Sequence, residues 1–293
     1  MTLLDAIILG IVEGLTEFLP VSSTGHLLIT NSLLGLSGEA ANAYAIVIQF
    51  GAIMAVAVYY HARLLQMAKG AFVAKSDGQR LILNLLIAFV PAAVVGLLFE
   101  DFIDTLMSWD GWIALALIVG GIVMIVVERL LPPEKRNRSR LEDITPMDAF
   151  VVGCAQCFAL WPGMSRSMST IVGGQLRGMT NSLAADFSFL LAIPTLGAAT
   201  VYKAYSDREA LVGAFEPTVM IVGIVVSFVV ALAAIAGFLR LLKTIGLEAF
   251  GAYRIVVGVL VFALIWAEVI EPAEVSQMID STWVSLQFLT MLN

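Results

Sequence analysis

Long apolar stretches alternate with short polar ones along most of the chain. Six of them are long and apolar enough to cross a bilayer as helices, since about 20 helical residues span about 30 Å of hydrocarbon. They cover residues 41–60, 82–99, 112–131, 184–203, 218–239 and 252–270. The pattern therefore predicts an all-α integral membrane protein with six transmembrane helices.

Two further apolar stretches, 5–34 and 148–178, are interrupted in the middle by proline, glycine and hydroxyl residues. The first interruption, 19–26, reads Leu-Pro-Val-Ser-Ser-Thr-Gly-His, and the second, 161–167, reads Trp-Pro-Gly-Met-Ser-Arg-Ser. Each half is too short to span a bilayer, so each stretch is predicted to be a re-entrant helical hairpin. Non-helical backbone at that depth is tolerated only where it is buried in protein or lines a wet cavity.

An internal repeat relates the two halves of the chain. The six residues from Asp5 read Asp-Ala-Ile-Ile-Leu-Gly, and those from Asp148 read Asp-Ala-Phe-Val-Val-Gly. The same offset pairs Glu13 with Gln156, Phe18 with Trp161, Ser22 with Ser165 and Tyr59 with Tyr202. Each half holds one hairpin and three crossings, and an odd number of crossings inserts the halves in opposite directions. We therefore predict a single membrane domain, 1–293, of two inverted repeats, 1–145 and 146–293, whose broken helices meet near the midplane.

Composition and charge agree with this topology. Hydrophobic residues make up 60% of the chain and charged residues 13%, whereas soluble domains average about 45–50% and 25%. Loops 61–80 and 129–142 are basic, while loop 100–110 and the segment after residue 270 are acidic. The positive-inside rule then places the basic loops in the cytoplasm and both termini outside. The net charge of −7 and the absence of a basic patch argue against nucleic-acid binding.

Two cysteines, Cys154 and Cys157, form a Cys-x-x-Cys pair within the second broken stretch. A redox or metal pair is one interpretation, but no second ligand pair follows in the sequence. We therefore expect small, buried packing residues.

Ionisable groups within apolar segments are expensive and are functional candidates. Glu13 and Glu17 are four residues apart, on one face of a helix. They could form hydrogen bonds between helices, or they could be solvated by water at the mouth of a cavity. Two carboxylates also suit a hard divalent cation, because Mg²⁺ takes one or two carboxylates together with phosphate oxygens.

Hydroxyl residues cluster where the second helix of each hairpin should begin. Ser22, Ser23 and Thr24 precede Gly25-His26, and a single N-cap would explain only one of the three. The free N–H groups and positive dipole of an opening helix bind phosphate. The second interruption repeats the design with Gly163 before three polar residues, Ser165, Arg166 and Ser167.

Arg166 and His26 add two groups with distinct chemistry. An arginine at that depth requires a planar oxyanion, either phosphate or, in a purely structural role, the carboxylate of Glu13 or Glu17. His26 follows Ser23 by three residues, which suits a nucleophile and its proton acceptor, although a lone histidine is often a satisfied core residue. The whole set is sufficient for phosphoryl transfer, which depends mainly on positioning and charge stabilisation.

The two interruptions resemble the signature motifs of the bacitracin-resistance type undecaprenyl-diphosphatases. Residues 13–26 read Glu-Gly-Leu-Thr-Glu-Phe-Leu-Pro-Val-Ser-Ser-Thr-Gly-His, and residues 162–167 read Pro-Gly-Met-Ser-Arg-Ser. The similarity covers essentially the whole chain, including residues 49–56, Gln-Phe-Gly-Ala-Ile-Met-Ala-Val. One departure is Met168, where the family usually has glycine after Ser-Arg-Ser, and we expect it to alter packing around the pocket.

The resemblance implies a multi-pass enzyme of the bacterial plasma (inner) membrane. It would hydrolyse undecaprenyl diphosphate to undecaprenyl phosphate and inorganic phosphate, recycling the lipid carrier for peptidoglycan synthesis and conferring bacitracin resistance. It implies a divalent cation, Mg²⁺ or Ca²⁺, and an active site open to the periplasmic face; a homodimer is compatible with the sequence. By motif position, Glu13 and Glu17 would bind metal, and Glu17, Ser23 (nucleophile), His26 (acid/base) and Arg166 (phosphate clamp) would be catalytic. Ser22, Thr24, Gly163, Ser165 and Ser167 would bind substrate.

Two other functions remain open from sequence. The inverted repeat alone would also suit a polyprenyl-phosphate flippase, either by itself or combined with hydrolysis. A flippase needs groups that bind phosphate but no nucleophile beside a base. A channel is disfavoured because no ring of repeated selectivity residues is evident.

Overall fold

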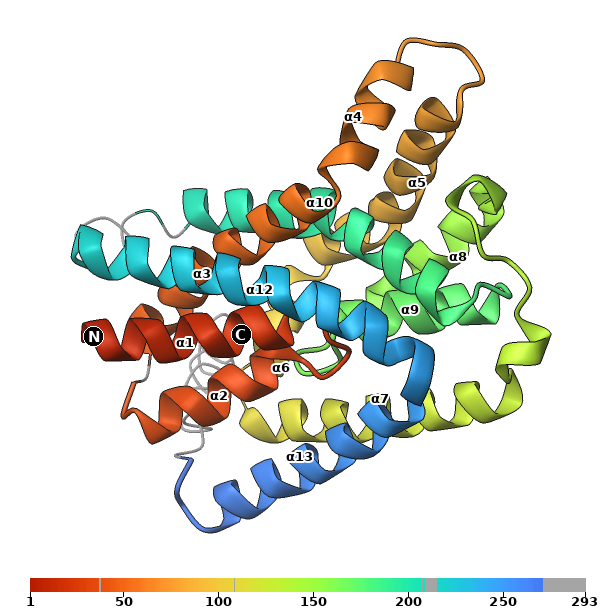
Figure 1. Ribbon diagram of the computed structural model, residues 1–293. Coiled ribbons are helices and arrows are strands. Elements are labelled where there is room, and N and C mark those ends of the chain that lie inside the picture. Colours follow the sequence, from red (N-terminus) through yellow and green to blue (C-terminus); the bar gives the residue numbers. More distant parts are fainter. Residues whose placement is uncertain (37, 108, 207, 209–214, 271–293) are drawn as a thin grey trace, which may run out of the picture.

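The structure is a computed structural model that describes residues 1–36, 38–107, 109–206, 208 and 215–270 (Figure 1). The first half contains α1 (Leu3–Thr16), α2 (Ser23–Leu33), α3 (Gly38–Tyr59), α4 (His61–Gly70), α5 (Asp77–Leu98), α6 (Glu100–Met107) and α7 (Asp110–Leu130). The second contains η1 (Pro133–Lys135), η2 (Leu141–Asp143), α8 (Pro146–Gln156), η3 (Cys157–Leu160), α9 (Arg166–Leu176), α10 (Asn181–Ser206), α12 (Pro217–Ile245) and α13 (Glu248–Trp266). The described part of the chain is helical throughout, apart from loops and one isolated β-bridge between Arg138 and Met179.

The predicted membrane spans are confirmed as long apolar helices. Five of them, α5, α7, α10, α12 and α13, are each long and apolar enough to cross a bilayer. The sixth prediction, 41–60, corresponds to α3, and the chain bends by 71° between α3 and α4. The acidic segment after residue 270 lies outside the described residues.

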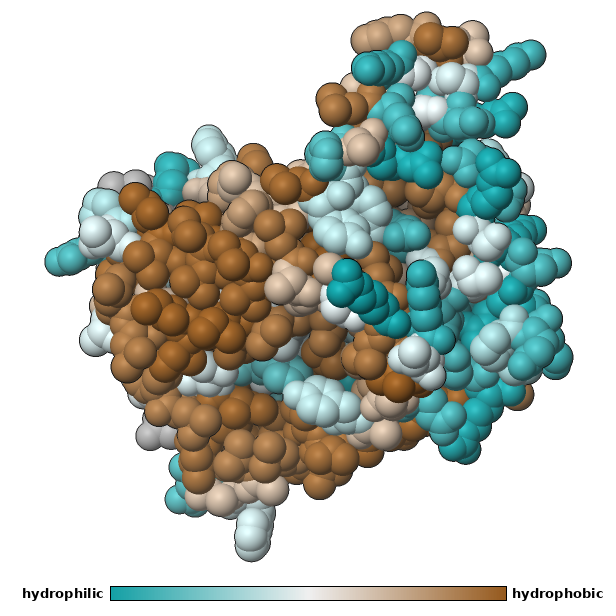
Figure 2. All heavy atoms as spheres, viewed as in Figure 1, coloured by the Kyte–Doolittle hydropathy of each residue, from teal (hydrophilic) through white to brown (hydrophobic). Residues whose placement is uncertain are grey.

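The apolar surface of these helices faces outward as well as inward. In the most apolar window of α5 only 28% of the residues are buried, although its mean hydropathy is 2.6. Hydrophobic side chains cover the surface over α3, α12 and α13, and hydrophilic ones gather at the edge where α7 connects to α8 (Figure 2). A surface this apolar requires lipid as its solvent, so the chain is a multi-pass membrane protein.

Glycines allow three helix pairs to pack closely. A Cβ atom on Gly14 of α1 would lie 2.7 Å from the carbonyl oxygen of Ser227 on α12, and one on Gly251 of α13 would lie 2.7 Å from that of Gly121 on α7. Gly51 of α3 meets the carbonyl of Ile224 on α12 in the same way. Small residues bring helix backbones together in lipid, where hydrophobicity gives no drive for association. The close pairs α1–α12 and α7–α13 lie on either side of α2 (Figure 1).

The two broken stretches share one local design. Each opens with a capping box, Thr2 with Asp5 in α1 and Thr145 with Asp148 in α8, in which side chain and backbone satisfy each other's free groups. Each second helix, α2 or α9, begins after a serine N-cap, Ser22 or Ser165, with φ of 73°. The helix–break–helix pattern predicted for 5–34 and 148–178 is therefore confirmed.

The cysteine pair lies beside the second break. Both cysteines are free, and Cys157 is partly buried. The prediction that both are buried packing residues is wrong for Cys154, which is exposed on the surface of α8. In a membrane protein an apolar surface side chain can face lipid, so burial in protein does not follow from an apolar sequence context.

Candidate functional site

The first break is formed by residues 17–22, between α1 and α2. Glu17 is the C-cap of α1, and Pro20 cannot continue the helix because it has no backbone N–H. Ser22 then takes a left-handed φ of 73°, and its Oγ accepts a hydrogen bond from the N–H of Gly25 at 3.4 Å. A positive φ at a non-glycine residue costs about 1–3 kcal/mol and persists where surrounding contacts enforce it. The geometry of α2's first turn is therefore imposed by its neighbours.

The second break, residues 161–165, repeats this geometry between η3 and α9. Gly163 has a φ of 92°, and a Cβ atom there would lie 2.5 Å from the carbonyl oxygen of Ile113. Ser165 has a φ of 73° and accepts from the N–H of Met168 at 3.3 Å. Met168 itself is buried, so the residue that departs from the family motif is in a packing position, as expected.

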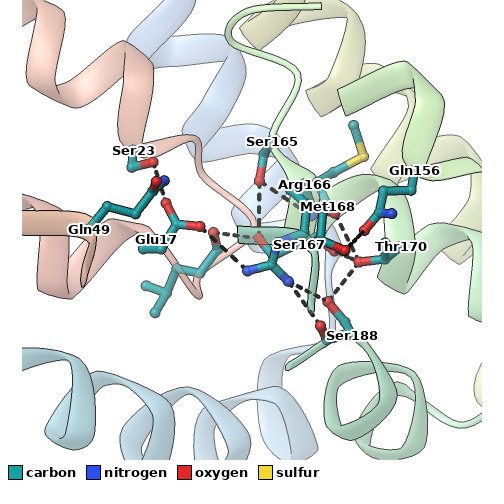
Figure 3. A network of polar contacts seen from close by, with 12 residues as sticks. Glu17, Ser23, Gln49, Gln156, Ser165, Arg166, Ser167, Met168, Thr170 and Ser188 are labelled. Atoms are coloured by element: carbon teal, nitrogen blue, oxygen red, sulfur yellow. Dashed lines mark hydrogen bonds and ion pairs between the residues drawn. The ribbon is translucent and has the colours of Figure 1, made fainter. Parts of the chain in front are cut away.

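The two breaks meet, which confirms the prediction that their polar tips come together (Figure 3). Ser167 Oγ donates to the carbonyl oxygen of Leu19 at 2.9 Å. Arg166 Nη2 lies 3.4 Å from Glu17 Oε1, in an ion pair whose side chains are 9% and 6% exposed. The guanidinium also lies 5.8 Å from the centre of the Phe18 ring. Groups 149 residues apart in sequence thus form one buried polar cluster.

Glu17 is the centre of this cluster. Its Oε2 accepts a hydrogen bond from Ser23 Oγ at 2.8 Å, while its Oε1 faces Arg166. A carboxylate that accepts a hydroxyl proton at this distance is positioned as a general base for that hydroxyl. The Ser23 hydroxyl is therefore hydrogen-bonded to Glu17, and the described contacts of His26 do not include the predicted one with Ser23.

Arg166 is oriented by α10. Its Nη1 donates to the carbonyl oxygen of Ser188 at 2.9 Å and to Ser188 Oγ at 3.2 Å. Thr170 Oγ1 donates to the Arg166 carbonyl oxygen at 2.8 Å, so the Ser188 hydroxyl donates to Thr170 Oγ1 across 2.6 Å and accepts from Arg166. This chain of hydrogen bonds fixes the guanidinium plane and leaves Nη2 directed at Glu17 (Figure 3). An arginine held in this way is suited to clamp a phosphate.

Glu13 lies one helical turn before Glu17 and is 2% exposed. Its Oε1 is buried and has no hydrogen-bond partner among the described residues. A buried carboxylate oxygen without a partner is costly, and a bound cation would remove that cost. Within the described ranges, no group of three or more His, Cys, Asp or Glu side chains is placed so that it could hold a metal ion by itself. The two carboxylates therefore fit a cation that takes its remaining ligands from phosphate and water, as Mg²⁺ and Ca²⁺ can.

His26 forms contacts away from Ser23. Its Nδ1 lies 2.8 Å from the carbonyl oxygen of Ser22, and its Nε2 lies 2.7 Å from the hydroxyl oxygen of Tyr253 on α13. The imidazole and phenol rings stack with centres 5.7 Å apart and an angle of 10° between planes. His26 is therefore part of the same break but has its own partner.

The predicted substrate-binding residues all lie in the two breaks or the helix turns that follow them. Ser22 and Ser165 are the N-caps, Thr24 is on the first turn of α2, and Gly163 is the turn residue of the second break. Ser165 Oγ and Ser167 Oγ share a hydrogen bond of 3.0 Å. The first turns of α2 and α9 thus present hydroxyls and helix N-termini to one region, a combination that binds phosphate.

Arg254 on α13 belongs to the site and was not identified from the sequence. It is fully buried and donates to the carbonyl oxygens of Pro20 at 3.2 Å and Gly163 at 3.0 Å, one from each break. It also donates to the carbonyls of Ala116 at 3.1 Å and Leu117 at 3.4 Å on α7. The signal was available, since an arginine in the predicted span 252–270 is itself a functional candidate.

A separate cavity of about 310 Å³ lies between α4, α5 and η2, away from the breaks. Arg63 and Glu142 at its edge form an ion pair of 3.0 Å. Hydrogen bonds from its own backbone N–H and from Arg63 hold the pKa of the Glu142 carboxyl below its usual range. This cavity contains none of the predicted site residues.

The amino-acid sequence of the chain is similar to those of known proteins. The family model described as "Bacitracin resistance protein BacA" matches residues 6–260. A protein of Sorangium cellulosum named undecaprenyl-diphosphatase is 53% identical over 266 residues, covering 89% of this chain and 85% of its own. One of Methylobacillus flagellatus with the same name is 44% identical over 270 residues, covering 91% of this chain and 99% of its own.

Proposed function

Because this chain belongs to the bacitracin resistance protein BacA family, we propose that it is, like its named relatives, an undecaprenyl-diphosphatase. It hydrolyses undecaprenyl diphosphate to undecaprenyl phosphate and inorganic phosphate. This reaction returns the lipid carrier to cell-wall synthesis and confers resistance to bacitracin. The observation that carries the proposal is Glu17, which accepts from Ser23 and faces Arg166 where the two breaks meet.

Ser23 is the nucleophile of the proposed reaction. Glu17 takes the hydroxyl proton as Ser23 Oγ attacks the terminal phosphorus, and undecaprenyl phosphate leaves. Water then hydrolyses the phosphoserine, releasing inorganic phosphate and restoring the Ser23 hydroxyl with the proton held by Glu17. Splitting one difficult step in two is the general advantage of covalent catalysis.

Arg166 and the helix N-termini hold the diphosphate. The ion pair of Arg166 with Glu17 opens when phosphate oxygens take the place of the carboxylate on Nη2. Ser188 keeps the guanidinium in place during this exchange, because it accepts from Nη1 on the other side, and Thr170 holds the Ser188 hydroxyl. The hydroxyls of Ser22, Thr24, Ser165 and Ser167, with the backbone turn at Gly163, line the same phosphate pocket.

A divalent cation, Mg²⁺ or Ca²⁺, is the proposed cofactor, held by Glu13 and Glu17. The partnerless oxygen of Glu13 supports this assignment. When bound, the cation supplies positive charge next to the phosphate oxygens. Glu13 then serves to hold the cation, while Glu17 also serves as the base for Ser23.

The topology we propose has two inverted repeats, 1–145 and 146–293, each with one re-entrant hairpin. The matching capping boxes and the equal φ of Ser22 and Ser165 support the repeat. In this topology the basic loops lie on the cytoplasmic side of the bacterial inner membrane, and the site opens to the periplasmic side. Hydrophilic residues lie in the crease over α2, between the hydrophobic surfaces of α12 and α13 (Figure 2), where a lipid headgroup could enter from the side.

A phosphate-release assay tests the proposal. Purified protein is given a polyprenyl diphosphate, and Glu17→Gln, Ser23→Ala and Arg166→Ala are each expected to lower turnover at least a hundredfold. Glu134→Gln and Arg240→Ala change exposed residues of the same types and serve as controls. Turnover within about tenfold in all three site variants, which is about 1.4 kcal/mol of barrier, would exclude the mechanism. A flippase without hydrolysis would release no phosphate, and the Ser23–Glu17 hydrogen bond gives that alternative no support.

A further inference from the structure

The contacts of His26 determine which ring nitrogen carries the proton. A backbone carbonyl only accepts hydrogen bonds, so Nδ1, which lies 2.8 Å from the Ser22 oxygen, must be protonated. In a neutral imidazole the other nitrogen is then an acceptor. Nε2 therefore accepts the hydroxyl proton of Tyr253 across 2.7 Å.

The position of Ser22 makes this arrangement rigid. With a φ of 73°, Ser22 places its carbonyl oxygen where it receives both the His26 backbone N–H, at 3.4 Å, and the ring Nδ1–H. Stacking on Tyr253 holds the ring on its other side. The strained N-cap that opens α2 thus also fixes the orientation of the imidazole.

Adjacent residues of α13 face two different environments. Arg254 is fully buried against the backbone of both breaks, whereas Tyr253 is 46% exposed. Tyr253 is therefore the member of this adjacent pair that lies at the surface of the structure. His26 has no hydrogen bond to Ser23 among those the structure describes, because the Ser23 hydroxyl donates to Glu17.

We propose that Tyr253 takes part in the reaction by relaying a proton from the hydrolytic water to Nε2 of His26. The inference rests on the proposed function and assigns a second proton-transfer unit to it. Glu17 serves Ser23 in the first step, and the His26–Tyr253 pair serves water in the second.

The relay balances in protons and bonds. Water forms a bond to the phosphorus of phosphoserine as the bond from phosphorus to Ser23 Oγ breaks. The water proton passes to the Tyr253 oxygen while the Tyr253 hydroxyl proton passes to Nε2, so tyrosine is unchanged and His26 becomes imidazolium. Glu17 returns its proton to Ser23 Oγ, and His26 releases its proton to solvent after the phosphate leaves.

The first test reads the tautomer directly and does not depend on activity. The chain has only two histidines, so His61→Gln leaves His26 as the sole histidine signal in protein labelled with ¹⁵N-histidine. At pH of about 8.5, well above the usual histidine pKa of about 6.5, the proton is expected on Nδ1. Tyr253→Phe should leave that proton in place and move the Nε2 resonance to the position of a nitrogen without a hydrogen bond. A proton on Nε2, or an Nε2 resonance unchanged by Tyr253→Phe, overturns the proposal.

The second test measures turnover. Tyr253→Phe keeps the stacked ring and removes only the hydroxyl, and it is expected to lower kcat about tenfold to a hundredfold, below the full effect of a lost general base. Tyr205→Phe, at an exposed tyrosine on α10, is the matched control. Equal kcat in the two variants overturns the relay. Failure of the proposed function would be distinguishable from failure of the relay. In that case the unaltered protein would release no phosphate, while the tautomer of His26 could still be measured.

Discussion

Replacing Arg254 with methionine should loosen both breaks at once. Arg254 is fully buried and donates to four backbone carbonyls, of which Pro20 and Gly163 belong to the breaks. Methionine has a similar reach and no donor, so the variant keeps much of the packing and removes the hydrogen bonds. The two other acceptors, on α7, lie in a regular helix and keep their helical partners.

The magnitude follows from the two carbonyls in the breaks. Each buried acceptor left without a donor costs about 1–3 kcal/mol, which gives about 2–6 kcal/mol for the pair. Part of this loss in stability is offset, because the variant no longer has the desolvation cost of a buried guanidinium. We expect a net loss of about 2–4 kcal/mol in the free energy of unfolding. Because Glu17 and Arg166 sit on the two loosened segments, kcat/KM should fall at least tenfold.

Two measurements on Arg254→Met check this reasoning. Denaturant unfolding in detergent gives the change in stability, and phosphate release gives kcat/KM. Arg254→Lys is the companion variant, since an ammonium on a flexible stem cannot reproduce the planar fork that spans both breaks, and it should recover only part of either loss. Inconsequential substitutions change the free energy of unfolding by about 0.5 kcal/mol or less. If the change in Arg254→Met stays within that limit and the variant retains full activity, Arg254 does not hold the breaks together.

Two further predictions concern the proposed cation and Asp148, which lies in the first turn of α8. Chelation with EDTA should abolish phosphate release, and added Mg²⁺ or Ca²⁺ should restore it. The Glu13→Gln variant should need a cation concentration at least tenfold higher for half-maximal activity. Activity that EDTA does not change would show that the reaction needs no cation. Asp148, whose side chain is fully buried, accepts from Arg138, from Arg177 at 2.7 Å and from Thr145. Asp148→Asn should therefore cost about 2 kcal/mol of stability, below the usual 3–5 kcal/mol for a broken buried pair because both arginines are about one third exposed. The KM of this variant should not change, and a raised KM at unchanged stability would contradict a purely structural role.

The sequence alone determined the features that depend on local chemistry. Apolar stretches of about 20 residues must be helices in lipid, because no other structure satisfies their backbone there. Proline, glycine and hydroxyl residues marked both breaks, since proline removes a helix donor and serine caps the helix that follows. The same reasoning selected Glu13, Glu17, His26 and Arg166, because each would be costly in an apolar segment without a partner.

Only the tertiary structure decided which of these groups are partners. Ser23 and His26 are three residues apart, yet the orientation of α2's first turn gives Ser23 to Glu17 and His26 to Tyr253, which is 227 residues away. Arg254 likewise acquires its role from carbonyls of two breaks and α7, none near it in sequence. The 71° bend between α3 and α4 lies at the end of the predicted span 41–60, and α4 is a helix where the sequence indicated only a basic loop. Such pairings depend on how helices pack in three dimensions, and a one-dimensional pattern of polar and apolar residues does not contain that information.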